Sequence, residues 1–394
     1  MIGFDAAQAL LAGAVVPLPA EEIALAEACG RVLAEPVHAA LSAPRHDVAA
    51  MDGYALRDAD AAVGARFRVI GESFAGGAFP PAVRAGEAVR IFTGAPMPEG
   101  ADRVVMQENC AADGAAMAIA QAYGPGWHVR KEGSDFARGD LLLPAGRLLD
   151  PLGIVALAAA DRASALVHRS PRLAVIATGD ELAPPGSARH DPRTIPESVS
   201  FGVAGMAAQH GARLVARHTG ADDLVALQGV AGAALSGADI VIVTGGASVG
   251  ERDFAKAMFA PHGLDILFSK VAIKPGKPVW LGRAQGRWVL GLPGNPTSAL
   301  VTARLFLVPL LAALQGRGAA QALAWESLPL AAGFSQMGNR TTFLRARRVA
   351  GALVVLDNQD SAAQAALAAA DWLVRCDPGD APIPPGGLAC ALRF

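Results

Sequence analysis

Three turns in the second half of the chain contain the residue types that bind anionic groups, and one of them is the basic turn at 274–278. The apolar run 239–244 leads into a glycine-rich turn at 244–250, and the run 288–292 leads into a Pro/Gly/Asn turn at 293–298. Glycine lets a ligand approach the backbone closely, and successive backbone N–H groups attract anions. These residues predict a pocket for a phosphate-bearing ligand. The alternative is a set of ordinary tight turns.

The turn at 293–298 should also begin a helix, and basic residues lie near it in the sequence. In Asn295-Pro296, asparagine is a favourable N-cap and proline a favourable first helical residue. We therefore expect the N–H groups of Thr297 and Ser298 to be free for an anion. Lys270 and Lys274 could supply the positive charge that a phosphate needs, or could simply be solvated.

Carboxylates occur at several turns and expected helix starts. Asp52 lies in an Asp-Gly turn, Asp135 in a loop after a strand-like run, and Asp222 and Asp253 where helices should begin. Each of these four is also typical of a turn or helix-capping residue. Glu181 is the clearest candidate on local grounds, because it ends the first strand of a predicted parallel sheet. Such acids could hold a divalent metal ion.

Composition excludes several classes of function. The chain has 394 residues, 52% of them hydrophobic, which suffices for two to four domains with real cores. A formal charge of -2, from 34 basic and 36 acidic residues, gives no basic field for nucleic acid or an anionic membrane. Aromatic residues are only 5%, too few to favour a platform for stacked bases.

The termini, cysteines and longest apolar stretch predict a cytoplasmic protein. Cys29, Cys110, Cys376 and Cys390 have neither zinc-site nor disulfide-framework spacing. The first residues lack the basic and apolar segments of a signal peptide. The stretch 299–314 is short for a membrane span and is interrupted by an arginine and a proline, so we expect a buried helix.

Hydrophobic periodicity divides the chain into regions of different type. It predicts helices over 4–14 and 20–34, short strands between 66 and 143, and a helix over 150–165. From residue 171, strands and helices alternate, which predicts a mostly parallel sheet covered on both faces. Its expected strands are 172–177, 212–217, 239–244, 265–272 and 288–292. Its expected helices are 198–210, 222–236, 253–260 and 296–314. After residue 316, short strands return, with a helix over 362–370.

In such a sheet, ligands bind at the carboxyl ends of the strands. The turns at 178–181, 244–250 and 293–298 should therefore lie together at one edge.

Six motifs, in order along nearly the whole chain, resemble the MoeA family, the molybdopterin molybdenumtransferases that include the gephyrin E domain. The motifs are Ala50–Ala55, Thr93–Asp102, Thr178–Leu182, Gly245–Gly250 with Asp253, Lys274–Pro278 and Gly291–Pro296.

The resemblance implies a multidomain α/β plus β fold with four parts. These are an elongated linker and dimerisation domain (1–19, 36–44 and 140–168), a β-rich lobe (20–35 and 45–139), a central MogA-like α/β parallel-sheet domain that binds molybdopterin (169–316), and a C-terminal β-barrel domain (317–394).

The resemblance also implies a reaction: insertion of molybdenum from molybdate into adenylated molybdopterin, with a divalent metal such as Mg²⁺ and release of AMP. The family is homodimeric, and its cleft lies between the α/β domain of one subunit and the β lobe of the other. Further partners would be other proteins of molybdenum cofactor biosynthesis or a molybdoenzyme, with neither nucleic acid nor membrane.

By motif position, the resemblance implies three groups of site residues. The catalytic residues would be Asp52, Asp135, Glu181, Asp222, Asp253, Lys270 and Lys274. The substrate-binding residues would be Thr93, Thr178, Gly179, Gly245, Gly246, Ser248, Gly250, Pro293, Gly294, Asn295, Pro296, Arg340 and Ser361. The metal ligands would be Glu181, Asp222 and Asp253.

Two positions depart from the family pattern and leave alternatives open. Glu197-Ser198-Val199 stands where the family has Asp-Ser-Asn, and Asp360 replaces the first glycine of Gln-Gly-Ser-Gly. These changes favour a second hypothesis, a homologue that binds or delivers molybdopterin without turnover. A third hypothesis is adenylylation of molybdopterin, but the additional β lobe and C-terminal domain argue against it.

Overall fold

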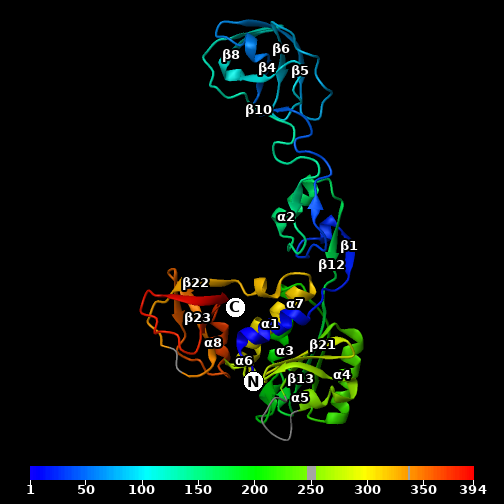
Figure 1. Ribbon diagram of the computed structural model, residues 1–394, viewed down its shortest axis with the longest axis vertical. Helices are drawn as coiled ribbons and strands as arrows, with labels where there is room; N and C mark the ends of the chain where they lie inside the picture. Colours follow the sequence, from blue (N-terminus) through cyan, green and yellow to red (C-terminus); the bar gives the residue numbers. More distant parts are fainter. Residues whose placement is uncertain (246–253, 336–337) are drawn as a thin grey trace.

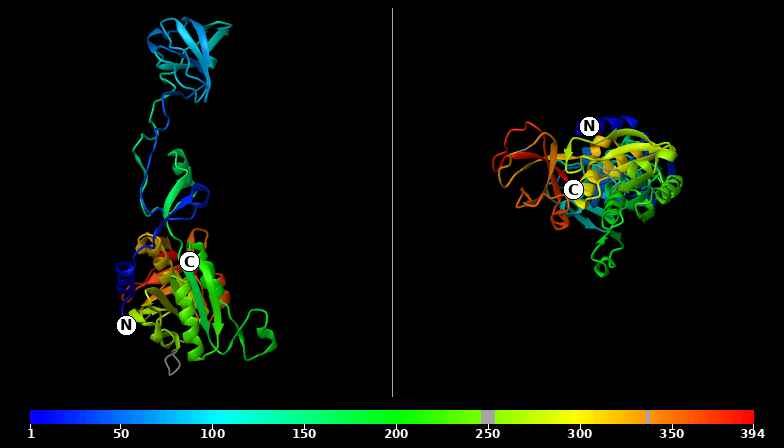
Figure 2. Two further views of the ribbon diagram at one scale, coloured as in Figure 1. Left: turned by 90° about the vertical axis from the view of Figure 1, so that its right-hand side faces the viewer. Right: turned by 90° about the horizontal axis from the view of Figure 1, so that it is seen from below.

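The computed structural model describes residues 1–245, 254–335 and 338–394. The molecule is elongated, with a β-rich lobe at one end, the α/β and C-terminal domains at the other, and a narrow body between them (Figure 1). Figure 2 shows the same separation from a direction at right angles.

The α/β domain is built on a sheet of six strands in the order β16-β13-β17-β21-β20-β18. The first four are parallel, and β20 runs antiparallel to both of its neighbours, β21 and β18. The strands are β13 (Arg172–Thr178), β16 (Arg213–Gly220), β17 (Ile240–Thr244), β18 (Asp265–Ser269), β20 (Trp280–Ala284) and β21 (Arg287–Leu292). The short strands β14 (Leu182–Ala183) and β15 (Ile195–Pro196) pair separately, near the end of β13.

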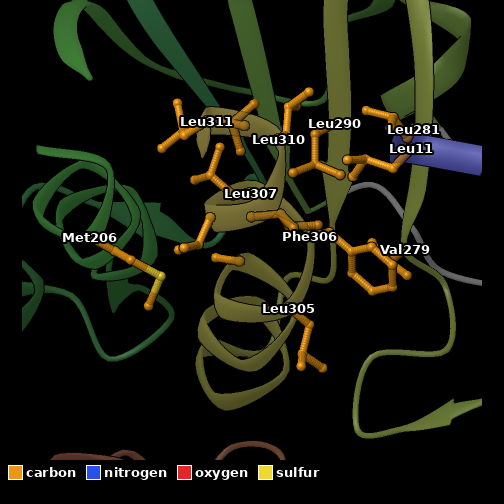
Figure 3. Close-up of a cluster of buried hydrophobic side chains, with 14 of the residues drawn as sticks. Leu11, Met206, Val279, Leu281, Leu290, Leu305, Phe306, Leu307, Leu310 and Leu311 are labelled. Carbon is orange, nitrogen blue, oxygen red and sulfur yellow. The ribbon is translucent and has the colours of Figure 1, made fainter. Parts of the chain in front are cut away.

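Alternate residues of β13 and β17 face opposite sides of this sheet and enter two different cores. On one face Val175 and Ile242 pack against α3 (Val199–Gln209), the helix 296–314 and α1 (Phe4–Ala14). Figure 3 shows this cluster around Phe306 and Leu310. The other face packs against α4 (Leu224–Gly237) and α5 (Phe254–Ala257). Short 3-10 turns lie at η4 (Ala188–His190) and η5 (Ala260–His262).

The predicted helix over 296–314 is present and buried. It consists of α6 (Pro296–Thr302), a π-helical segment η6 (Ala303–Leu307) and α7 (Val308–Leu314). Pro309 lacks an N–H donor and would clash in a regular helix, so the wider turn before it has a local cause. In the described residues, this helix alone is long and apolar enough to cross a membrane, and 94% of its apolar window is buried. Such burial is typical of a core helix.

A buried carboxylate ties the amino ends of β13, β17 and β21 together. Asp239 is 3% exposed and accepts hydrogen bonds from Arg169 at 2.8 and 3.0 Å, from Arg172 at 2.9 Å through its backbone, and from Arg287 at 3.3 Å. Although burial alone would raise the pKa of Asp239, the arginine contacts outweigh it and hold that pKa well below its usual range.

The β-rich lobe contains a sheet in the order β7-β4-β6-β5-β9-β8. Its strands are β4 (Gly53–Leu56), β5 (Arg66–Ser73), β6 (Glu87–Ile91), β7 (Arg103–Met106), β8 (Cys110–Asp113) and β9 (Ala116–Ile119), with a separate pair, β3 (Val48–Ala49) and β10 (Val129–Arg130). Short 3-10 turns lie at η2 (Asp58–Asp60) and η3 (Gln107–Asn109).

The narrow body corrects three expectations. The predicted helix over 20–34 is wrong: the segment forms β1 (Ala20–Ala24) and the short turn η1 (Leu25–Glu27). Strand β1 pairs with β12 (Ser164–His168), so the expected helix over 150–165 ends early, as α2 (Pro151–Ala159). Residues 20–35 therefore pack in this body, together with β2 (Val37–His38) and β11 (Leu141–Leu143), whereas the resemblance implied that they belong to the β lobe.

The C-terminal domain has a sheet in the order β19-β23-β25-β26-β22. A further strand, β24, pairs with the second half of β23. Its elements are η7 (Ala319–Ala322), β19 (Ile273–Lys274), β22 (Trp325–Pro329), β23 (Thr341–Val349), β24 (Ala352–Val355), α8 (Gln364–Ala368), β25 (Trp372–Cys376) and β26 (Leu388–Arg393). A bridge between Leu330 and Leu353 brings the end of β22 beside β24, so the sheet curls back on itself.

Candidate functional site

The turns after three neighbouring parallel strands meet at one edge of the α/β sheet. Thr244 pairs with Ala177 on one side and with Leu292 on the other, so the three carboxyl ends are in register. A Cβ atom on Gly245 would lie 2.3 Å from the Thr178 carbonyl oxygen, and one on Gly294 would lie 3.3 Å from the Gly245 Cα. The glycines thus allow these turns to touch.

A pocket of about 600 Å³ opens at this edge. It lies beside β13, where the chain order of the strands reverses, which is the usual ligand position in such sheets. The predicted residues that line it are Thr178, Gly179, Glu181, Asp222, Gly245, Pro293, Gly294, Asn295 and Pro296. The lining residues that sequence analysis did not propose as site residues include Ile195, Pro196, Glu197, Pro278, Ala362 and Gln364.

Two carboxylates at the pocket could hold a metal ion. Glu181 packs over the turn, because a Cβ on Gly179 would lie 2.7 Å from its carboxylate oxygen, and Asp222 donates its backbone N–H to Asp180 at 3.0 Å. In the part of the chain that the structure describes, no three His, Cys, Asp or Glu side chains form a metal cage. Mg²⁺ commonly binds through one or two carboxylates together with substrate oxygens, so Glu181 and Asp222 fit it.

At the start of α6, one of the two N–H groups expected to be free, that of Thr297, has a partner. Asn295 occupies the N-cap position but makes no capping bond; its side chain donates instead to the Ser361 hydroxyl at 3.0 Å. The Thr297 N–H donates to the Ser361 carbonyl oxygen at 3.2 Å. The C-terminal domain therefore covers part of the helix start, and Ser361 lies beside the pocket.

The loop that carries Ser361 is held by buried Arg345. This side chain is 1% exposed and donates to the carbonyl oxygens of Asn358 at 2.8 Å and Asp360 at 3.0 Å. The Asp360 carboxylate accepts the Ala362 N–H at 2.7 Å. The departure from glycine at position 360 thus makes a turn contact of its own.

The other departure also has a local role. Glu197 is 3% exposed and accepts hydrogen bonds from the Ser200 N–H at 2.8 Å and the Ser200 hydroxyl at 2.5 Å, so it satisfies the first turn of α3. The sequence signal that could have indicated this role is the position of Glu197 directly before the predicted helix over 198–210.

The basic residues predicted for the site lie outside the pocket lining. Lys270 and Lys274 are both exposed, and Lys274 belongs to β19, which pairs with Thr342 of β23. Arg340 is next to this segment and donates to the Ile273 carbonyl oxygen at 3.3 Å. Their position beside the pocket was inferred from sequence distance alone, whereas β19 directs this segment toward the C-terminal domain.

The β lobe holds a second group of predicted residues far from the pocket (Figure 1). The Thr93 N–H and hydroxyl both donate to one Asp52 carboxylate oxygen at 2.7 Å, and these two bonds lower the pKa of Asp52, with a smaller contribution from Arg90. Asp135 is exposed, and its backbone N–H donates to the Ala43 carbonyl oxygen at 3.0 Å.

Four predicted site residues lie outside the described residues. They are Gly246, Ser248, Gly250 and Asp253.

Comparison with known proteins shows the same architecture and related sequences. Residues 2–160 match a family model described as the MoeA N-terminal region (domain I and II), and residues 174–313 match one described as a probable molybdopterin binding domain. A solved molybdopterin biosynthesis MoeA protein from Pyrococcus horikoshii superposes with a TM-score of 0.83 and 27% sequence identity, covering 100% of this chain and 99% of that one.

Curated relatives agree with these matches. The molybdopterin molybdenumtransferase of Haemophilus influenzae is 37% identical over 302 residues, 76% of this chain and 74% of that protein. That of Staphylococcus aureus is 32% identical over 372 residues, 91% of this chain and 87% of that protein. The chain belongs to the MoeA family, the molybdopterin molybdenumtransferases.

Proposed function

We propose that this protein inserts molybdenum from molybdate into adenylated molybdopterin and releases AMP, with the help of a divalent metal ion. The observation that carries the proposal is the pocket at the carboxyl edge of the sheet, which is lined by glycine turns and by the carboxylates of Glu181 and Asp222. The relatives named molybdopterin molybdenumtransferase support the reaction type.

Different groups of residues that line the pocket would have different roles in the reaction. The close-packed turns at Gly245 and Gly294 leave room for the phosphate side of the substrate to approach the backbone. Glu181 and Asp222 would hold Mg²⁺, which when bound would offset negative charge on phosphate and molybdate oxygens. Without such a cation, these carboxylates would repel both substrates.

The β lobe would complete the site from a second copy of the chain. Thr93 favours the ionised form of Asp52, and the β lobe that contains Asp52 lies at the opposite end of the molecule from the α/β domain that contains Glu181 (Figure 1). A homodimer that places one lobe over the partner's pocket would bring the two acids together. The proposed location of the reaction is the cytoplasm.

Two local contacts argue against a purely delivering role. Both departures from the family pattern form hydrogen bonds within their turns: Glu197 with Ser200, and Asp360 with Ala362. These contacts support the local structure of both turns, whereas the assay below tests the effect of the lost asparagine amide and glycine on turnover.

The test is AMP release by the purified protein from adenylated molybdopterin, with and without molybdate and Mg²⁺. We expect AMP release that depends on both ions and falls strongly in Glu181→Gln, whereas Glu326→Gln, at an exposed site on β22, should behave like wild type. Tight ligand binding without AMP release would contradict the transferase proposal and favour delivery. ATP consumption instead would favour adenylylation.

A further inference from the structure

Four side chains form a stacked column on the surface of the β lobe. The rings of Phe74 and Phe92 are parallel within 11°, with centroids 4.7 Å apart. The Arg90 guanidinium lies over the Phe92 ring at 4.7 Å and over the Tyr54 ring at 5.1 Å. Phe74 ends this column and is 48% exposed, so it presents a flat ring surface that the column itself does not cover.

Hydrogen bonds fix the column in place. Ser73, before Phe74, is 1% exposed; its hydroxyl donates to the Pro96 carbonyl oxygen at 2.9 Å, and its own carbonyl oxygen accepts the Phe92 N–H at 3.2 Å. Arg90 donates to the Gly53 carbonyl oxygen at 2.8 Å. An exposed ring with so constrained a backbone loses little freedom when it binds a flat partner.

The column adjoins the proposed catalytic acid of the lobe. Phe92 directly precedes Thr93, which donates both of its hydrogen bonds to Asp52. The turn after Phe74 packs against the turn after Thr93, because a Cβ on Gly94 would lie 3.7 Å from the Ala75 Cβ. Phe74 therefore belongs to a turn that packs against the turn that binds the Asp52 carboxylate.

We propose that Phe74 is a substrate-binding residue that stacks on a flat, fused heteroaromatic ring. This inference rests on the proposed function, whose substrate contains two such rings, a pterin and an adenine. Aromatic faces bind fused heterocycles through stacking that is largely independent of their hydrogen-bonding edges. Loss of one such contact corresponds to about a 5- to 150-fold weaker interaction.

Replacement of Phe74 by residues of different shape tests this assignment. Phe74→Leu keeps an apolar side chain but removes the flat face, and Phe74→Trp restores a flat face. The matched control is Phe201→Leu on α3, which is 46% exposed and also stacks on an arginine, Arg217, at 3.6 Å. Thermal unfolding of each full-length variant checks that the fold is retained.

The first measurement is the AMP-release assay. We expect Phe74→Leu to raise KM for the adenylated substrate by about 5- to 150-fold, with a smaller change in kcat, and Phe74→Trp to restore KM. Phe201→Leu should leave KM unchanged. Wild-type KM in Phe74→Leu would overturn the assignment, and a shift from dimer to monomer in that variant on sizing would show a subunit contact instead.

Direct titration separates this inference from the proposed function. Neopterin, followed by its fluorescence, and AMP, followed by calorimetry, are titrated into the full-length wild type and the Phe74 variants. Binding of one of them that is lost in Phe74→Leu and regained in Phe74→Trp supports stacking and identifies the ring, even if the protein releases no AMP. If no AMP is released and neither compound shows Phe74-dependent binding, the inference is overturned together with the proposed function.

Discussion

Gly245→Ala is the substitution that most directly perturbs the contact between the turns that follow β13, β17 and β21. Gly245 has a φ of 90°, where an L-residue is strained by about 1–2 kcal/mol. Its added Cβ would also lie 2.3 Å from the Thr178 carbonyl oxygen. Because that atom belongs to the backbone of β13, relief requires the ends of β13 and β17 to separate, by roughly 1 Å given ordinary contact distances.

Gly263→Ala is the matched control. Gly263 has a φ of 72° in the same domain, but a Cβ there would meet no atom within 4 Å. Gly263→Ala should therefore lose about 1–2 kcal/mol of stability, which lowers the apparent Tm by about 2–8 °C, and Gly245→Ala should lose at least as much because of the added clash. Only Gly245→Ala should deform the pocket.

The AMP-release assay then distinguishes strain from pocket geometry. A misplacement of about 1 Å in a binding site can cost about 100-fold in rate, so we expect kcat/KM of Gly245→Ala to fall by about that factor. Gly263→Ala should retain nearly all of its activity at 25 °C. Equal kcat/KM in the two variants would refute the reasoning that the close contact of the turns forms the substrate site.

Three further predictions concern charge and loop position. Asp239→Asn should destabilise the α/β domain by about 3 kcal/mol at pH 7, measured by hydrogen exchange in β17. Because the pKa of Asp239 is lowered on folding, its contribution exists above about pH 4 and is lost as the pH falls further, so the two proteins should converge in acid. Thr93→Val removes one hydrogen bond that lowers the pKa of Asp52, so the acid limb of the activity profile should move to higher pH, whereas Thr93→Ser should not shift it. Arg345→Met should free the loop that covers α6 and speed exchange of the Thr297 amide; unchanged exchange there would argue against a positioning role.

The sequence predicted the elements whose hydrophobic pattern agrees with their burial in the fold. The apolar run 240–244 is a fully buried strand, as expected for a parallel sheet with both faces covered, and the apolar stretch 296–314 is a buried helix. Thr178, Gly245 and Gly294 meet because carboxyl ends of parallel strands share one edge, which is a consequence of topology.

The misassigned segments depend on partners far away in the sequence. Residues 20–24 have apolar positions compatible with a helix, but they pair with 164–168, and no local pattern reveals such a partner. Strand β20 was not predicted. It is antiparallel to β21 and is joined to it by a tight turn, so it does not follow the alternation of strand and helix on which the prediction was based. The local sequence also does not reveal contacts between domains. The Thr297 N–H, for example, donates a hydrogen bond to the Ser361 carbonyl oxygen of the C-terminal domain.

Complementation between two inactive variants tests the central claim, that each site combines the pocket of one subunit with the β lobe of another. Asp52→Ala and Glu181→Ala alter residues at opposite ends of the molecule (Figure 1). If the two chains are mixed so that subunits exchange, half of the dimers should be mixed, and each should contain one site with both acids. The account predicts that neither variant alone releases AMP and that the mixture recovers about one quarter of wild-type activity. No recovery, with subunit exchange verified, would contradict it.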